Sequence, residues 1–305
     1  MSFVYHANAL AFGGVNNKPC CDVIPSQASV VLAPSGGEGS QTVRNFNYKG
    51  IISFDEASVY VGGSQKGCFR NTVSTAMIRN LNLMNVVHIE LLCVRVTSEH
   101  VAVDDKPQSE CGDPAFTFEG SIIDNVRIAG RRVNVTLDTG IFSRYPTHSD
   151  FVNAFAGDAV TEDKVLAGET PSASTLATPA APIAPENRLT TRYGKRFCWP
   201  ADRCVNGAPS KSGVIRASLV ADMDIPDTDE DFSDEEARRR IDKIKPVRRN
   251  GYIVRIADFG TLAIGEVILK ENQRTVNMLR YTLGSPNDGS GTVCSGTTNG
   301  TDMFP

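Results

Sequence analysis

Ser121–Asp138, reading S-I-I-D-N-V-R-I-A-G-R-R-V-N-V-T-L-D, is the stretch that best indicates the fold. Apolar and polar residues alternate on both sides of Ala129-Gly130, most clearly in 126–128 and 133–137. Because successive side chains leave a strand on opposite faces, this period of two predicts two half-buried strands. Glycine supplies the positive φ that a tight turn requires. The stretch therefore predicts a β-hairpin.

Residues 72–97 continue the strand signal over a longer distance. We expect two strands, about 72–83 and 86–97, with the turn near Asn85. The second is nearly apolar throughout, which predicts a central strand covered on both faces. A helix over 75–92 is the competing interpretation, since short apolar runs are ambiguous. The many β-branched residues favour strands.

Shorter strand patterns fill much of the remaining chain. Gly13-Gly14 and Gly62-Gly63 are expected to end strands, Asp55-Glu56 to form a turn, and 34–40 to form a flexible loop. The expected strands cover 3–13, 28–32, 47–54, 57–61, 213–222, 252–257, 262–269 and 275–283.

These patterns predict an all-β protein, with an antiparallel β-sandwich or barrel-like domain and extended arms. We expect a β-rich core in 1–160. A proline-, alanine- and threonine-rich arm or linker follows at 161–190, because its composition is typical of an extended segment. Strands in 191–284 complete the core or form a second small β domain. A flexible tail follows at 285–305, where glycine, serine and threonine predominate.

One short helix is expected at about 234–244. Ser233-Asp234-Glu235-Glu236 forms a capping box, in which the serine and Glu236 can bond each other's backbone N–H groups. Acidic residues begin the segment and arginines follow, which suits the helix dipole. A second, shorter helix could begin at Ser149-Asp150 and run to Phe155.

Composition excludes several classes of function. The chain has 305 residues, 41% of them hydrophobic, and a net charge of −4. This charge gives no electrostatic basis for nucleic acid as the main partner. The sequence contains no run of about 18 apolar residues, so we expect no membrane span. The N-terminal residues lack a secretory signal, so we expect a cytoplasmic protein, with the cell surface or extracellular space reached by another route.

The eight cysteines do not define a metal site. Cys198 and Cys204 could form a local disulfide or half of a metal site, but no second pair stands at a suitable spacing. Cys93 lies in an apolar strand pattern and is interpreted as a buried thiol. His6 is interpreted as a strand side chain. We therefore predict no metal, no cofactor and no catalytic residue.

Two acidic motifs are candidates for chemistry. Asp138-Thr139-Gly140 follows a hydrophobic strand, as in aspartic proteases, where two carboxylates share a proton. The sequence contains no second triplet, so a strand ending in a turn is favoured. The acidic loop 222–234 lacks the spacing of a calcium-binding EF-hand. Lys245, Arg248 and Arg249 could meet an acidic surface or be solvated.

Several segments resemble uncharacterised β-rich bacterial proteins and are loosely similar to the bacterial surface families called choice-of-anchor. The resemblance lies in I-S-F-D-E-A-S-V-Y-V-G-G-S at 52–64, the strand pair in 72–97, S-E-H at 98–100, and G-S-I-I-D-N-V-R-I-A-G at 120–130. It covers roughly 3–150, with weaker support at 251–283. It implies a β fold and carries no catalytic residues.

The leading functional hypothesis is a structural protein, a subunit of a homo-oligomeric assembly such as a filament, tube or shell. The segments 36–40, 161–190 and 285–305 carry too little apolar area to offset the backbone ordering cost, so neighbouring copies would have to hold them. The alternative is a carbohydrate- or surface-binding β-sandwich module. The third hypothesis is an aspartic-type hydrolase that uses Asp138.

Overall fold

A computed structural model describes most of the chain on either side of its proline-rich middle. The residues described are 2–18, 22–101, 113–140, 145–150, 198–199, 215–225, 247–250, 252–270, 273–284 and 288–303. Within them the chain is almost entirely strand, and neighbouring strands run antiparallel. The predicted all-β, antiparallel fold is confirmed.

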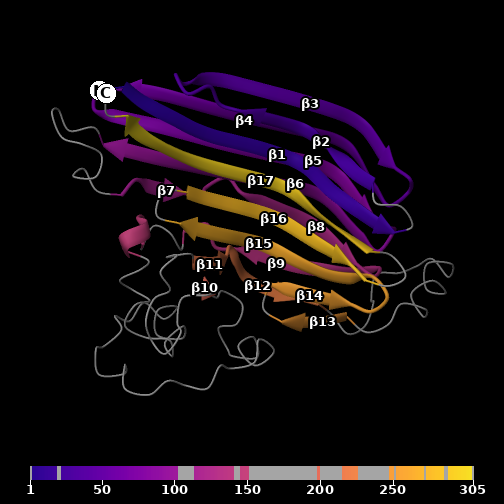
Figure 1. Cartoon of the computed structure of the whole chain (residues 1–305). Helices are drawn as coiled ribbons and strands as arrows, with labels where there is room; N and C mark the ends of the chain where they lie inside the picture. Colours follow the sequence, from indigo (N-terminus) through magenta and orange to yellow (C-terminus); the bar gives the residue numbers. More distant parts are fainter. Residues whose placement is uncertain are drawn as a thin grey trace, which may run out of the picture.

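The strands form two sheets that face each other (Figure 1). The nine-stranded first sheet contains, in spatial order, β10 (Cys198–Trp199), β11 (Ile215–Ser218), β15 (Gly260–Lys270), β16 (Gln273–Leu283), β17 (Asp288–Met303), β1 (Ser2–Lys18) and β2 (Asp22–Val31), with β14 (Ile253–Ile256) beside β15 and β13 (Val247–Asn250) beside β14. The eight-stranded second sheet contains β12 (Val220–Asp224), β9 (Arg131–Leu137), β8 (Ile122–Ile128), β6 (Val87–Val101), β5 (Phe69–Leu83), β4 (Ile52–Lys66) and β3 (Gly37–Tyr48), with β7 (Ala115–Thr117) beside β6.

The hairpin predicted from Ser121–Asp138 is present as β8 and β9. Ala129 and Gly130 form its turn with φ angles of 53° and 81°. Two successive positive φ values match the twist of the flanking strands, which is why such turns are favoured in hairpins. Val126 pairs with Val133 across the hairpin, and both side chains are buried.

The strand pair predicted in 72–97 is present as β5 and β6, with Asn85 in the turn, so the helix over 75–92 is wrong. β6 is central, as expected, between β5 and β8. Its inward residues Leu92 and Val94 are fully buried, but its outward residues are half-buried or exposed. The expectation that both faces are covered is therefore wrong, because only the inward face is buried.

Several predicted strand boundaries are also wrong. β1 runs through Gly13-Gly14 to Lys18, and β4 runs through Gly62-Gly63 to Lys66. Asp55-Glu56 lies inside β4, because the turn comes earlier, at Lys49 and Gly50, both with positive φ. The expected loop 34–40 gives way to β3 at Gly37. Glycine is typical of turns, but here the neighbouring strands pair with these glycines and continue through them.

The tail predicted to be flexible is instead a long, central strand. β17 spans Asp288–Met303 and pairs with β16 on one side and β1 on the other. Its glycines allow close packing: a Cβ atom on Gly291 would lie 2.5 Å from the hydroxyl of Tyr281. A Cβ on Gly289 would lie 2.5 Å from the carbonyl oxygen of Val15. The glycine content that suggests a mobile tail is therefore what allows the side chains and backbone of neighbouring strands to approach β17 closely.

Both sheets bend along a line that crosses their strands. In the second sheet, the register places Asn45, Asp55, Asn80, Glu90 and Asn125 in one row across five strands. The three asparagines have φ angles of 48–56°. Asparagine is among the residues that tolerate this left-handed conformation best. We call this row and its counterpart in the first sheet the creases.

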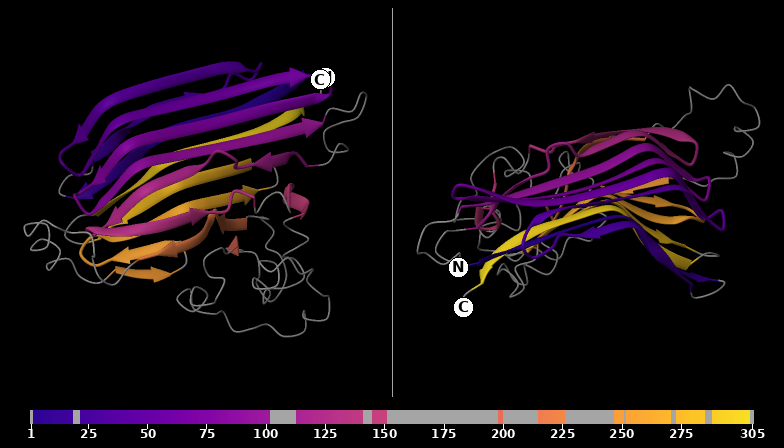
Figure 2. Two further views of the ribbon diagram at one scale, coloured as in Figure 1. Left: turned by 180° about the vertical axis from the view of Figure 1, so that it is seen from behind. Right: turned by 90° about the horizontal axis from the view of Figure 1, so that it is seen from above.

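The crease of the first sheet is built in the same way. Its row contains Gly265, Met278, Cys294, Ala11 and Ala28, and the first, third and fifth of these have positive φ. The strand pairing continues in the same register on either side of each row. The sheets therefore bend without an inserted residue, and Figure 2 shows them bending in the same sense.

The crease interrupts the inward and outward alternation of the second sheet. Each strand places two successive residues outward there, as Asp55 and Glu56 do in β4. Two hydrogen bonds fasten the row: Asn80 Nδ2 donates to Asp55 Oδ2 at 2.6 Å, and Asn125 Nδ2 donates to Glu90 Oε2 at 2.7 Å. The asparagine side chains thus stabilise the bend that their backbones make.

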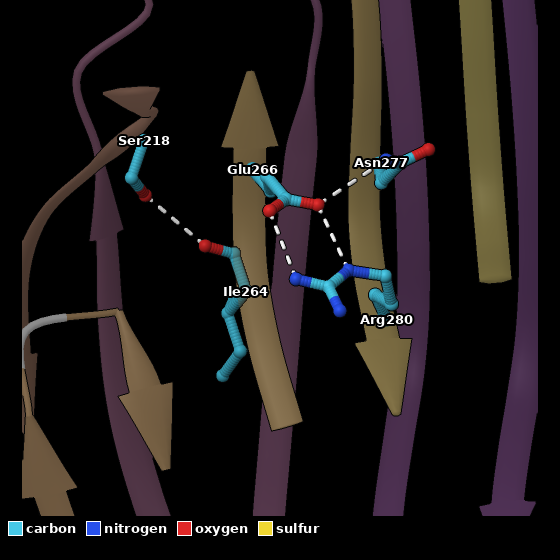
Figure 3. A network of polar contacts seen from close by, with 5 residues as sticks. All are labelled: Ser218, Ile264, Glu266, Asn277 and Arg280. Atoms are coloured by element: carbon cyan, nitrogen blue, oxygen red, sulfur yellow. Dashed lines mark hydrogen bonds and ion pairs between the residues drawn. The ribbon is translucent and has the colours of Figure 1, made fainter. Parts of the chain in front are cut away.

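The strand predicted at 213–222 is divided between the two sheets. β11 pairs with β15 in the first sheet, whereas β12 pairs with β9 in the second. Between them, the Leu219 N–H donates to Gly265 O and its carbonyl accepts from the Asp138 N–H. The Ser218 hydroxyl donates to Ile264 O at 3.1 Å (Figure 3). Residues 218–220 therefore join the sheets at one side.

The remaining predictions concern segments that the structure describes only in part. Helix is present at 148–150, one residue before the expected start, and its continuation toward Phe155 lies outside the described residues. The arm at 161–190 and the helix at 234–244 also lie outside them. Within the described residues, no helix is long and apolar enough to cross a membrane.

Gly291→Ala should lower the free energy of unfolding by about 2 kcal/mol, because its Cβ would overlap the Tyr281 ring at 2.6 Å or less. Gly13→Ala in the neighbouring strand is the control, since its nearest neighbour is a leucine side chain at 3.4 Å. Urea unfolding of both variants tests the prediction. Equal stability of the two variants would contradict the close-packing role of Gly291.

Ala28→Gly should be less destabilising than Ala76→Gly, by about 1 kcal/mol. Both alanines are buried, but Ala28 has a φ of 48°, which costs an L-residue energy and costs glycine little. Chemical unfolding of the two variants measures the difference. If both lose the same stability, the crease does not strain Ala28.

Candidate functional site

The structure does not gather the residues singled out in the sequence into one site. Asp138 follows β9, and its backbone N–H donates to Leu219 O at 2.7 Å. Asp222 and Asp224 belong to β12, while the acidic loop from 226 onward lies outside the described residues. Within the described residues, no three His, Cys, Asp or Glu side chains are grouped so that they could hold a metal ion.

The other singled-out residues are equally dispersed. Cys198 lies in β10, whereas Cys204 falls outside the described residues. Arg248 and Arg249 lie in β13, and Lys245 is not described. His6 is exposed on β1, as expected of a strand side chain.

The buried thiol is not the one that we predicted. Cys93 is only half-buried, whereas Cys294 is completely buried, and both are free. The Cys294 thiol donates to Leu92 O of the opposite sheet at 3.3 Å. Burial raises the pKa of the Cys294 thiol well above its ordinary value. The sequence around Cys294, rich in glycine and threonine, gave no signal of burial.

A buried carboxylate in the first sheet is held by side chains of the next strand (Figure 3). Glu266 is 1% exposed. Both of its oxygens accept hydrogen bonds from the Arg280 guanidinium at 2.9 Å, and Asn277 Nδ2 lies 3.4 Å from Oε2. The ion pair raises the pKa of Arg280. Because a bidentate arginine occupies the carboxylate, the contact is suited to holding β15 against β16 rather than to proton transfer.

A cluster of basic side chains lies between the sheets, beside Phe3 near the start of the chain. We call Arg70, His100 and Arg274 the terminal cluster. His100 and Arg274 are 1% and 0% exposed. The Phe3 ring contacts the His100 ring edge-on, and its centroid lies 4.9 Å from the Arg70 guanidinium carbon. The centroid of the Phe116 ring lies 5.2 Å from the Arg274 guanidinium carbon. Aromatic faces thus stabilise the two guanidinium groups.

Burial and the neighbouring charges keep His100 neutral. Burial, followed by the charges of Arg274 and Arg70, lowers the pKa of His100 to about 4. Burial also lowers the pKa of Arg274 to about 10, although Asp113 opposes this shift. A histidine that protonates only near pH 4 is poorly matched to acid–base catalysis at neutral pH. We therefore interpret the terminal cluster as a packing feature.

A hollow of about 210 Å³ lies on the outer face of the second sheet, at the crease. Its lining includes Asn80, His88, Glu90, Asn125 and Arg127, and it contains no phenylalanine, tyrosine or tryptophan. Asn125 already donates to Glu90. Burial lowers the pKa of His88. The hollow could receive a small polar molecule, but Asn125 and Glu90 already bond each other and Asn80 bonds Asp55.

In the part of the chain that the structure describes, one side of the sandwich ends in long strand edges without a further partner strand. Within the described residues, β3 pairs only with β4, and β2 pairs only with β1 (Figure 1). In β3, residues 37–44 run from the loop before the strand to the crease at Asn45. We call residues 37–44 the edge segment. An uncovered strand edge presents backbone N–H and C=O groups that can pair with a further strand.

Lowering the pH should weaken the fold through His100. Its pKa is about 4 in the folded protein and about 6.5 when unfolded, so the unfolded chain binds more protons between these values. The free energy of unfolding therefore has its full value, as far as His100 is concerned, above about pH 6.5. It falls as the pH decreases to about 4, by about 3 kcal/mol.

The measurement is the free energy of unfolding in urea at pH 7 and pH 4, for the wild type, His100→Gln and His6→Gln. His100→Gln should show a smaller pH dependence than the wild type. His6 is exposed, so His6→Gln should behave as the wild type. An unchanged pH dependence in His100→Gln would show that His100 does not cause the effect.

Comparison with known proteins identifies a family without an assigned activity. Residues 3–270 match the model of a family described as a domain of unknown function (DUF8256). No curated protein and no solved structure matches the chain at a significant level. The matched region begins in β1 and ends with β15. Because it covers most of the chain, this protein belongs to the family of the domain of unknown function DUF8256.

Proposed function

We propose that the protein is a structural subunit that assembles with copies of itself. The observation that carries the proposal is the edge segment, an uncovered strand edge of the second sheet. Its sequence, G-E-G-S-Q-T-V-R, contains no proline and no lysine, the residues that most often blunt such edges. A long edge without proline or lysine favours pairing with another chain.

The neighbouring edge strand β2 supports the proposal by contrast, because it is protected. Pro25 lies within it, in a bulge between its pairings with Phe12 and Gly14. The N–H of Ser29 on this strand donates to the Gln41 side chain of β3 at 2.7 Å. Proline and a bulge both prevent regular pairing. Among the strands that the structure describes, one edge is thus blocked and the adjacent edge is open, as expected if the open edge has a partner.

Exposed apolar side chains near the open side add to this support. Val23 and Val31 of β2 are 74% and 77% exposed. Single exposed apolar residues are common, but these two are the most exposed large apolar side chains among the described residues. A second copy at this side of the sandwich could cover them.

The resemblance to choice-of-anchor surface families stays a prediction.

Wild-type protein should form particles larger than one chain at micromolar concentration, measured by size-exclusion chromatography with light scattering and seen by electron microscopy. A Ser40→Lys and Thr42→Lys double variant should run as a folded monomer, because lysines on an edge strand oppose pairing. Both residues are exposed on β3.

Ile122→Lys is the control for added charge, because Ile122 is 46% exposed but lies on β8, inside the sheet. It should assemble as the wild type does. Wild-type protein that remains monomeric at high concentration would overturn the proposal.

A further inference from the structure

We infer that the partner of the edge segment is the edge segment of a second copy, paired antiparallel with Gln41 of the two copies opposite each other. This inference rests on the proposed function and specifies its contact. The resulting two-fold contact would join the eight-stranded sheets of two copies into one continuous sheet.

The backbone sets the centre of this pairing. Gly36 and Gly37 have φ angles of 84° and 97°, so the chain turns before the segment. Asn45 has a φ of 56° and bends the strand at the crease. The regular strand between these points is 38–44, and its middle residue is Gln41. A second copy that pairs along the whole regular edge must therefore be centred on Gln41.

The same register makes the charges complementary. With Gln41 opposite its counterpart, Glu38 of each copy faces Arg44 of the other, and Ser40 faces Thr42. Opposite charges directly across an antiparallel pair stabilise it, and the two-fold symmetry supplies two such pairs. The charge pattern and the backbone thus give the same centre independently.

Other registers lack this complementarity. A centre one residue earlier places Glu38 opposite Thr42, and a centre one residue later places Arg44 opposite Ser40, so neither forms an ion pair. Parallel pairing in register places like charges side by side, which destabilises a sheet. The antiparallel pairing about Gln41 is the one that uses both charges.

The charged side chains are available for this contact. Glu38 and Arg44 are both exposed. Their contacts within the chain are long: Arg44 Nε lies 3.6 Å from Glu56 Oε2, and the Tyr60 hydroxyl lies 3.3 Å from Glu38 Oε2. An ion pair of this kind at an exposed surface contributes little. A second copy can therefore compete for both groups.

Charge reversal tests the register. Glu38→Arg and Arg44→Glu should each weaken self-association about tenfold in sedimentation equilibrium, because each places like charges opposite each other. The double variant should restore wild-type association, because the pairs return with their signs exchanged. Glu99→Arg, which changes an exposed acid on β6, is the control and should associate as the wild type.

A cross-link tests the position of the two-fold axis. Opposite residues of an antiparallel pair have Cα atoms about 4.5–5.5 Å apart, within reach of a disulfide. Gln41→Cys, with the exposed Cys68 changed to serine, should therefore form a covalent dimer on oxidation. Ile122→Cys in the same background is the control and should not.

The outcomes separate the two proposals. Three results would each contradict the pairing about Gln41 while leaving self-assembly in place, provided that the wild type assembles. They are charge reversal without effect, a double variant that does not restore association, and a Gln41→Cys variant that does not cross-link. If the wild type is monomeric at every concentration, both are wrong. Weakening by each single charge variant, restoration by the pair and a cross-link in the Gln41→Cys variant together support the inferred contact.

Discussion

The shared bend of the two sheets is the constraint on which the rest of the structure depends. Two facing sheets can stay in contact only if they bend at the same place and in the same sense. The Cys294 thiol of one crease bonds the carbonyl of Leu92, two residues beyond Glu90 in the other. A left-handed residue on alternate strands produces the bend while strand pairing continues on both sides.

Close backbone approach is the second requirement of this architecture. Tyr281 lies over Gly291 and Gly14, and Tyr5 lies against Gly63, where a Cβ atom would stand 2.8 Å from its ring. Each large ring fits because the glycine that it contacts, in the same sheet or in the opposite one, carries no side chain. Glycine-rich strands thus form the interior rather than loose ends, and the C-terminal strand β17 becomes central between β16 and β1.

The two sides of the sandwich differ in how the two sheets are joined and in how their edge strands are protected. On one side, Leu219 bonds both sheets and joins them. On the other, β2 is interrupted by Pro25 and capped by Gln41, whereas β3 has no second partner strand among the described residues between its glycine turn and the crease. The crease therefore also limits the length of edge that a partner strand could use.

The sequence by itself determined the two strand pairs with the clearest alternation. Alternation in 121–138 and 72–97, with turns at Gly130 and Asn85, depends only on which side chains face the core, so it was predictable. Tertiary structure decided the rest. Whether Gly291 is loose or packed depends on Tyr281 in the neighbouring strand, and whether Asn80 ends or bends a strand depends on Asp55 beside it. The open edge was likewise not predictable, because an edge exists only once the order of strands is fixed, and long-range pairing, not local sequence, fixes that order.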